Sequence, residues 1–352
     1  PWYFGTYSAA CIPMVFVLKL LRLPAIHAFA LTNVLFYLLA LYCVYKKLNL
    51  SAKTKLGLLL LLMLNPAVFY IIWISAEVFI FSMIILAMIQ WTNQKYWQSA
   101  VLISIASSLN PTILALAPIL TIDYAYWLYQ NGEDKTARGF IHQIKKNYKS
   151  ILIYCICYVI ALIPFAYNLI YTGHINLTAG AGGFFDDHLV LPRFWAYLTD
   201  LNFGFLPYYG LTFLLSIVLS VVAAIKQLYR GVLMMVGFLF TVFLYSFMEH
   251  INCGMSGIAR YSCWGAPILL FSLAVTYAQL FKNAFWRRAF EVIICISLMW
   301  SGFVVYSYGL MGATRTTSIS MTPFARKVLD YFPSLYNPLP STFNSRITGV
   351  DG

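Results

Sequence analysis

Long apolar stretches, separated by short polar ones, dominate the pattern of this sequence. A stretch of about 20 apolar residues is typical of a helix that crosses a membrane. The pattern therefore predicts an all-α polytopic membrane protein with about ten transmembrane helices. The predicted helices are 24–45, 56–74, 77–91, two within 98–130, 150–172, 205–225, 231–248, 262–281 and 289–308.

Two of the apolar stretches do not have the length of a single span. Residues 98–130 are too many for one helix, and Pro111 disfavours a helical conformation at Asn110. We therefore expect a hairpin of two helices that turns at this point. Residues 8–21 are too few, and they are followed closely by Arg22, which predicts a helix lying on the membrane surface.

The composition excludes a soluble protein. Hydrophobic residues make up 61% of the chain and charged residues only 10%, whereas about a quarter of an ordinary soluble domain is charged. The net charge of +12 does not indicate a nucleic-acid partner, because the basic residues lie between apolar stretches and form no stripe studded with aromatics. Cys253 and Cys263 lie near one predicted loop, where they can pair or remain free thiols, and free thiols are the favoured interpretation.

The basic residues are distributed unequally between the two sides of the predicted membrane domain. The side with more lysine and arginine is expected to face the cytoplasm. This places 1–23 at the outer face as an interfacial segment, 24–308 in the membrane, and 309–352 outside as a C-terminal tail. The cytoplasmic set has fifteen members, namely Lys46, Lys47, Lys53, Lys55, Lys95, Lys135, Arg138, Lys145, Lys146, Lys149, Lys226, Arg230, Lys282, Arg287 and Arg288, against eight on the other side.

Glu77 is an acidic residue at the predicted outer mouth of two helices. An ionisable group at such a position usually faces a cavity or a partner. It can equally be a carboxylate that stabilises the N-terminus of a helix, with Ser75 as the N-cap. Asp123 and Glu291, in contrast, lie near predicted cytoplasmic helix ends, where we expect structural pairing.

Two predicted outer loops collect the remaining polar side chains. Asp186 and Asp187 precede a histidine in loop 173–204, and such a trio can bind a metal, perform acid/base chemistry, or form a solvated turn. Loop 249–261 combines an acid, an imidazole and a guanidinium next to a predicted helix start, which suits a phosphate. Arg260 can alternatively hold lipid headgroups or pair with Glu249. The candidate substrate-binding residues of this second loop are Glu249, His250, Arg260 and Tyr261.

Several segments make the chain similar to the GT-C superfamily of polytopic glycosyltransferases, which includes protein O-mannosyltransferases and aminoarabinose transferases. The similarity covers most of the chain in layout. The matching segments are 1–7 (PWYFGTY), 64–77 with its Asn65-Pro66 pair, the break at Asn110-Pro111, 202–209 (NFGFLPYY), 257–261 (GIARY) and 333–338 (PSLYNP).

This resemblance implies that a sugar is transferred from a polyprenyl-phosphate donor to a glycan, lipid or protein acceptor at the outer membrane face. It also implies a bacterial inner membrane, and a divalent metal is compatible with it. The family's catalytic acid precedes the segment that matches 1–7, and no acidic residue here precedes Glu77. We therefore expect either that the catalytic acid lies upstream of residue 1 or that the protein is not an active transferase, and the first is the favoured interpretation. The alternative function is a transporter or flippase for a lipid-linked or amphipathic substrate.

Overall fold

The computed structural model of the chain describes residues 5–132, 134–174, 189–248, 257–281, 284–312 and 320–348. Within these residues every regular element is a helix, either α or 3-10, and there is no strand. The predicted all-α class is confirmed.

Six helical segments of this described part are long and apolar enough to cross a membrane. They indicate an integral membrane protein, in agreement with the apolar composition. The six are His27–Lys47 (α2), Pro111–Gln130 (η2 and α6), Tyr148–Thr172 (α8 and α9), Phe205–Ile225 (α12), Ser262–Leu280 (α14) and Arg287–Ser307 within α15 (Ala284–Gly312).

The predicted number of about ten membrane-spanning helices is not confirmed by these lengths. The other apolar helices have 12 to 17 residues. At 1.5 Å per residue they are roughly 18–26 Å long, less than the ~30 Å hydrocarbon core. They are α1 (Gly5–Leu20), α3 (Ala52–Met63), α4 (Glu77–Thr92), α5 (Tyr96–Ser107) and α13 (Tyr229–Tyr245).

Two Asn-Pro pairs interrupt the helices, and one of them corrects a sequence prediction. The helix predicted over 56–74 is not continuous, because α3 ends at Met63 and the 3-10 helix η1 (Pro66–Tyr70) follows. Asn65 is extended and its Oδ1 accepts a hydrogen bond from the N–H of Ala67 at 2.9 Å, so its side chain caps η1. Asn110 caps η2 (Pro111–Ala115) in the same way. The hairpin predicted within 98–130 is confirmed, since α5 ends before this cap and α6 (Leu116–Gln130) follows it.

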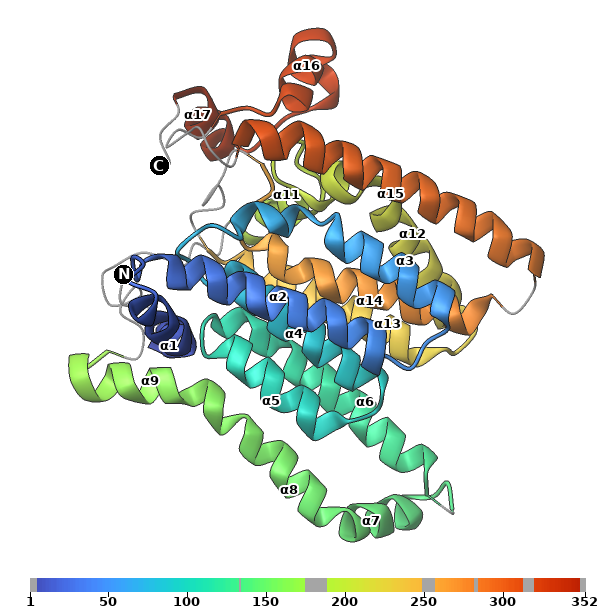
Figure 1. The fold of residues 1–352 in the computed structure, drawn as a ribbon. Helices are drawn as coiled ribbons and strands as arrows, with labels where there is room; N and C mark the ends of the chain where they lie inside the picture. Colours follow the sequence, from blue (N-terminus) through green and yellow to red (C-terminus); the bar gives the residue numbers. More distant parts are fainter. Residues whose placement is uncertain are drawn as a thin grey trace.

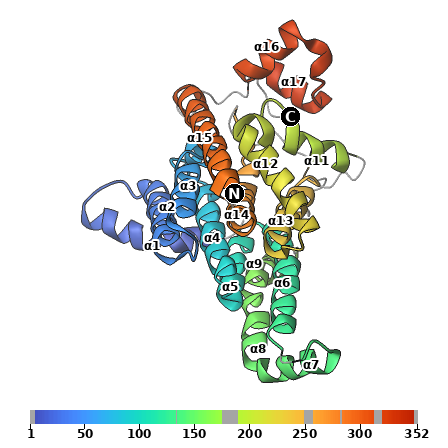
Figure 2. The same cartoon turned by 90° about the vertical axis from the view of Figure 1, so that its right-hand side faces the viewer.

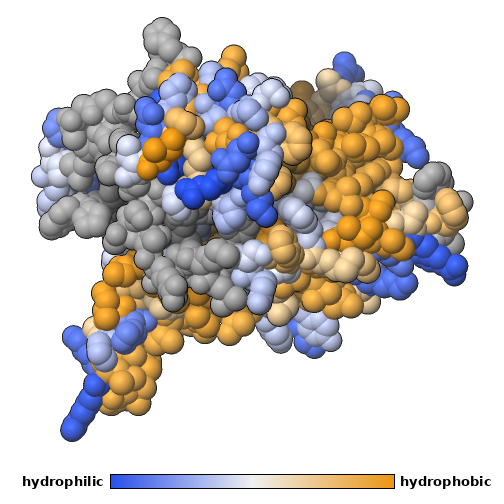
Figure 3. Space-filling view, turned by 90° about the horizontal axis from the view of Figure 1, so that it is seen from above, coloured by the Kyte–Doolittle hydropathy of each residue, from blue (hydrophilic) through white to orange (hydrophobic). Residues whose placement is uncertain are grey.

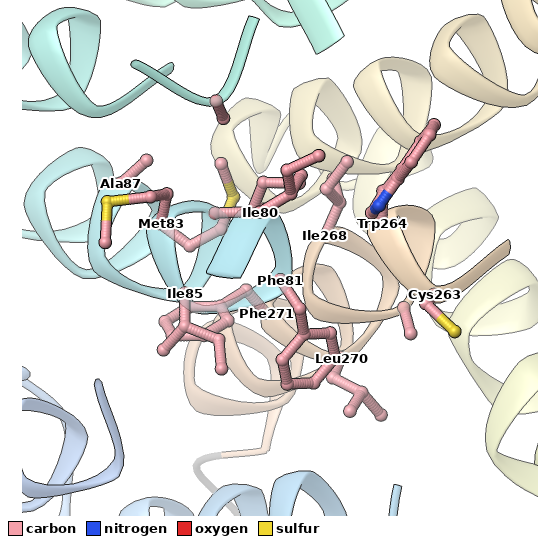
Figure 4. Packing of buried hydrophobic residues seen from close by; sticks show 14 of the residues in the cluster. Ile80, Phe81, Met83, Ile85, Ala87, Cys263, Trp264, Ile268, Leu270 and Phe271 are labelled. Carbon is pink, nitrogen blue, oxygen red and sulfur yellow. The ribbon is translucent and has the colours of Figure 1, made fainter. Parts of the chain in front are cut away.

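Helices α4 and α14 form the centre of the bundle, with α2, α5, α12 and α13 around them (Figures 1 and 2). Both are buried along most of their length. In the core, Phe81 and Ile85 of α4 lie beside Leu270 and Phe271 of α14 (Figure 4). Close side-chain packing of this kind is what holds helices together where lipid replaces water as the solvent.

Three parts of the chain extend from this bundle. An arm of α7 (Ala137–Lys146), α8 (Tyr148–Cys157) and α9 (Val159–Thr172) runs along α5 and α6 (Figure 1). Helix α1 projects sideways from α2 (Figure 2) and exposes apolar side chains. The C-terminal helices α16 (Pro323–Tyr331), η3 (Pro333–Leu335) and α17 (Pro340–Thr348) lie beyond the C-terminal end of α15, near α11 (Val190–Thr199) (Figure 1).

The bundle has two chemically different ends. Successive helices alternate in direction, so the lysine-bearing C-terminal end of α2 and the first residues of α3 and α15 lie at one end, here named the basic end (Figure 1). The N-termini of α4 and α14 lie at the opposite end, named the site end. Seen from above, apolar side chains cover much of the right-hand half of the molecule, while hydrophilic ones gather over the tail helices and along the right-hand edge (Figure 3).

Candidate functional site

A salt bridge joins the two central helices at the site end. The Nε of Arg260 lies 3.1 Å from Oε1 of Glu77. Glu77 is the first residue of α4, and Arg260 lies two residues before α14, so the packing of these helices brings the two side chains together. Only 7% of the Glu77 side chain is exposed, against 29% for Arg260. The buried carboxylate therefore holds a cationic side chain that is itself partly exposed.

The structure supports both interpretations of Glu77, the helix N-terminal carboxylate and the carboxylate that faces a partner. Its place in the first turn of α4 puts the carboxylate at the positive end of the helix dipole. The N-cap is Ala76, which makes no side-chain hydrogen bond, so the suggestion that Ser75 caps the helix is wrong. Glu77 is thus both a helix N-terminal carboxylate and the partner of Arg260.

Tyr261 completes the surroundings of the guanidinium. Nη2 of Arg260 donates to the Tyr261 hydroxyl at 3.3 Å, and Cζ lies 5.2 Å from the Tyr261 ring centroid. The Tyr261 ring in turn lies 4.8 Å from that of Trp264. An aromatic face beside a cation stabilises its charge and keeps apolar surface next to it. The three sequence candidates that the structure describes, Glu77, Arg260 and Tyr261, are therefore neighbours.

One oxygen of Glu77 has no hydrogen-bond donor among the described residues. This oxygen, Oε2, is buried. A buried carboxylate oxygen without a donor is costly, by roughly 1–3 kcal/mol, and such an atom in a native protein calls for an explanation.

A polar scaffold that the sequence analysis missed holds the segment before Glu77. The amide of Asn33 donates to the carbonyl oxygens of Ile71 and Trp73, both at 3.3 Å. Tyr7 donates to the Asn33 Oδ1 at 2.8 Å, which fixes the amide. In the sequence, the amide of Asn33 within a long apolar stretch was a detectable signal. In the structure, this side chain is fully buried.

Tyr70 of η1 connects the two sides of the site. Its hydroxyl donates to the carbonyl oxygen of Ile258 at 2.8 Å, two residues before Arg260. The Asn65-Pro66 break creates η1 and therefore places Tyr70. The backbone break at Asn65-Pro66 thus determines where the segment carrying Arg260 packs against η1.

The C-terminal tail is attached to the α11–α12 corner at the site end by a second polar cluster, named here the tail joint. Tyr336 donates to Oδ2 of Asp200 at 2.8 Å and accepts from Nδ2 of Asn202 at 2.7 Å. Thr322 donates its backbone N–H to Asn202 at 2.9 Å. The tail joint consists of Asp200, Asn202, Thr322, Tyr336 and Arg346, and sequence reasoning did not identify it.

Burial dominates the electrostatics of the tail joint. Desolvation raises the pKa of the Asp200 carboxyl, although hydrogen bonds from Asn202 and Tyr336 and the nearby Arg346 act in the opposite direction. Arg346 is 3% exposed, donates to the carbonyl oxygen of Ser320 at 2.9 Å and lies over the Phe203 ring. The tail is therefore held by buried polar contacts as well as by apolar ones.

The buried acid at the basic end has a structural explanation. Oδ2 of Asp123 accepts from Nε1 of Trp91 at 2.8 Å and the hydroxyl of Tyr96 at 3.1 Å, and lies 3.2 Å from Nε of Arg230. These residues belong to α4, α5, α6 and α13, so one carboxylate ties four helices together. The expected structural pairing of Asp123 is confirmed, as is that of Glu291, which pairs with Lys53 at 3.4 Å.

Four sequence candidates, Asp186, Asp187, Glu249 and His250, lie outside the described residues. Among the described residues, no group of three or more His, Cys, Asp or Glu side chains could hold a metal ion. Cys263 is a buried free thiol, while Cys253 lies outside the described part of the chain.

No protein-family model, curated protein or solved structure matches this chain. The functional interpretation therefore depends on the arrangement of Glu77, Arg260 and Tyr261 at the site end.

Proposed function

We propose that this protein is a membrane glycosyltransferase that transfers a sugar from a polyprenyl-phosphate donor to an acceptor at the outer face of the membrane. The observation that carries the proposal is the Glu77–Arg260 pair, in which a nearly buried carboxylate holds a partly exposed arginine side chain at one end of the bundle. A lipid-linked donor needs its phosphate bound at the edge of the membrane, and the end of a helix bundle offers that position.

The proposed reaction assigns a role to each member of the pair. The bond between the sugar C1 and the phosphate oxygen breaks, and its electrons leave with the polyprenyl phosphate. The acceptor hydroxyl oxygen forms the new bond to C1 and gives its proton to a basic side chain. Arg260 stabilises the charge that develops on the departing phosphate, because guanidinium makes bidentate, charge-assisted bonds. Glu77 orients Arg260 through its Oε1 atom.

The remaining elements of the proposal come from the sequence. Asp186, Asp187, Glu249 and His250 are candidates for acceptor binding and proton transfer. The GT-C-like architecture with about ten spans, the bacterial inner membrane and a divalent metal are parts of the same proposal. The partly exposed ring of Tyr261, packed on the buried Trp264, provides an aromatic surface next to Arg260, which suits the apolar face of a sugar ring.

The test is a transfer assay with the purified protein in liposomes. The substrates are a panel of polyprenyl-phosphate sugars, and the readout is the release of polyprenyl phosphate. Arg260→Ala should reduce turnover by about 100-fold or more, the usual loss when a group that stabilises developing negative charge is removed. Arg260→Lys should retain part of it, because a lysine keeps the charge but not the bidentate geometry. Arg326→Ala, which removes an exposed arginine of the tail, is the matched control and should leave turnover unchanged.

Two results would overturn the proposal in different ways. Wild-type turnover in Arg260→Ala would remove this pair from the site. If no sugar is transferred but the intact lipid-linked sugars change leaflet in a protein-dependent manner, the protein is a transporter.

A further inference from the structure

A second site lies at the basic end, away from the Glu77–Arg260 pair. A cavity of about 260 Å³ opens between α3, α14 and α15. Its walls are almost entirely apolar and are formed by Leu58 and Leu61 of α3, Leu270 and Ala274 of α14, and Ile294 and Leu298 of α15. This volume approaches the lower end of the range for small-molecule sites, about 300 Å³. We name this cavity the α3–α15 groove.

The shape of the groove is that of a slot along the helix axes. On α15 it extends from Phe290 to Leu298, which at 1.5 Å per residue is roughly 12 Å. At the basic end it is lined by the stacked rings of Tyr277 and Phe290, whose centroids are 4.5 Å apart. A slot of this length with apolar walls accommodates part of a single hydrocarbon chain.

Charged residues lie at the end of the groove that is nearest to the basic end. Nζ of Lys53 lies 3.4 Å from Oε1 of Glu291, and 73% of the Lys53 side chain is exposed. Exposed ion pairs of this kind contribute little stability, so Lys53 can exchange its partner at small cost. Arg287 is exposed one helical turn before Glu291 on α15, next to the groove rather than in its lining. Two cations and one anion therefore lie at or beside this end of the groove.

We propose that the α3–α15 groove binds one chain of a lipid with a phosphate headgroup, with the phosphate held by Lys53 and Arg287. The apolar walls suit a hydrocarbon chain, and the cations at the end of the groove suit a phosphate, so the two features together favour this occupant. An added transmembrane helix would have to cover the Lys53–Glu291 pair with apolar surface, whereas a phosphate replaces Glu291 as the partner of Lys53. Positive side chains at the membrane surface attract anionic lipids in general, and the groove adds a place for the chain. This inference does not depend on the proposed sugar transfer.

Cys295 offers a direct reporter, because it lines the groove and is exposed. Cys155 of α8 is also exposed and does not line the groove, so it is an internal control. The experiment measures the alkylation rates of both thiols by N-ethylmaleimide in the full chain in detergent. Lysophosphatidic acid, with one chain and a phosphate headgroup, is the probe, and the monoacylglycerol with the same chain and no phosphate is the comparison.

Lysophosphatidic acid should slow alkylation of Cys295, by about tenfold at ten times its dissociation constant, and leave Cys155 unchanged. The monoacylglycerol should protect about tenfold less well. Ala274→Phe should abolish protection by filling the groove, while Met299→Phe, on an exposed position of α15 outside it, should not. Lys53→Ala combined with Arg287→Ala replaces only exposed side chains and should abolish the preference for phosphate.

Three results would overturn the inference. Absence of protection would exclude a lipid chain from the groove. Equal protection by both lipids would exclude phosphate recognition. Equal loss of protection in Ala274→Phe and Met299→Phe would place the lipid on the general surface of the protein.

Discussion

The Glu77 carboxylate is almost fully buried, and its stability at that position depends on Arg260. Removal of one member of a buried pair leaves an uncompensated charge, which is more costly than the pair was worth. Arg260→Ala should therefore destabilise the folded protein by about 3 kcal/mol. Glu77→Ala should cost less, about 1 kcal/mol, because the partly exposed Arg260 can be solvated.

A double-mutant cycle tests this coupling. The variant with both alanines should be less destabilised than the sum of the two single variants, as residues in direct contact are not additive. The measurement is thermal unfolding in detergent micelles. Strictly additive effects would show that the two side chains do not interact in the folded protein.

The sequence predicted the members of this site but not their pairing. Glu77 and Arg260 stood out because they are charged residues next to long apolar helices, which is a local signal. Their contact depends on the packing of α4 against α14, which are far apart in the chain. The sequence offered Glu249 only as an alternative partner of Arg260 and did not indicate Glu77. Asn33 and Tyr70 were missed for a related reason, since a buried amide or tyrosine gives no local indication of the backbone carbonyl that it will bind.

At the scale of elements, the two helix breaks show when the local residues are sufficient to predict where a helix ends. The turn at Asn110-Pro111 was predicted correctly, because proline restricts the residue before it and the apolar stretch was too long for one helix. The same residue pair at Asn65-Pro66 was overlooked, because the stretch 56–74 has the length of a normal span. The apolar composition and the length of 56–74 therefore favoured one continuous helix, although Asn65-Pro66 indicates a break.

The tail joint yields a prediction about attachment of the C-terminal helices. Tyr336→Phe removes two hydrogen bonds and leaves Asp200 Oδ2 and Asn202 Nδ2 without that partner. The cost should be about 1–3 kcal/mol and should be confined to residues 320–348. Hydrogen exchange of the tail measures it, and Tyr331→Phe, at a tail position that is 75% exposed, is the control that should change nothing. Uniform loss of protection across the whole bundle would contradict a local role.

Asp200 makes the same attachment depend on pH. Because burial raises the pKa of Asp200 in the folded protein, the folded state binds the proton more tightly than the unfolded one. The contribution is fully present below the ordinary carboxyl pKa and is lost as pH rises through the raised value. After correction for intrinsic exchange rates, tail protection should fall as the pH rises above the ordinary carboxyl pKa of about 4. Asp200→Asn keeps the shape without the charge, so its protection should be independent of pH; an unchanged pH dependence would assign the titration to another group.

For the whole molecule, the apolar composition was enough to predict a helical membrane protein, whereas the predicted number of about ten spans is not confirmed by the helix lengths. Helices α3, α4, α5 and α13 are too short to cross a bilayer alone by length, although the apolar pattern around them continues. Hydropathy records the polarity of a segment and not the point at which its backbone leaves the helix. The tail joint and the α3–α15 groove are likewise products of tertiary packing.

The orientation of the molecule in the membrane is the property on which the proposed function depends most. Lysine and arginine are about twice as frequent in the loops assigned to the basic end, which should therefore face the cytoplasm. Tyr331→Cys places a thiol on the exposed tail at the site end, and Lys226→Cys places one at the basic end, also exposed. A membrane-impermeant maleimide should label Tyr331→Cys on intact cells and Lys226→Cys only after permeabilisation, each above the background of the parent chain. The reverse pattern would put Glu77 and Arg260 in the cytoplasm, where no donor displayed on the outer leaflet could reach them.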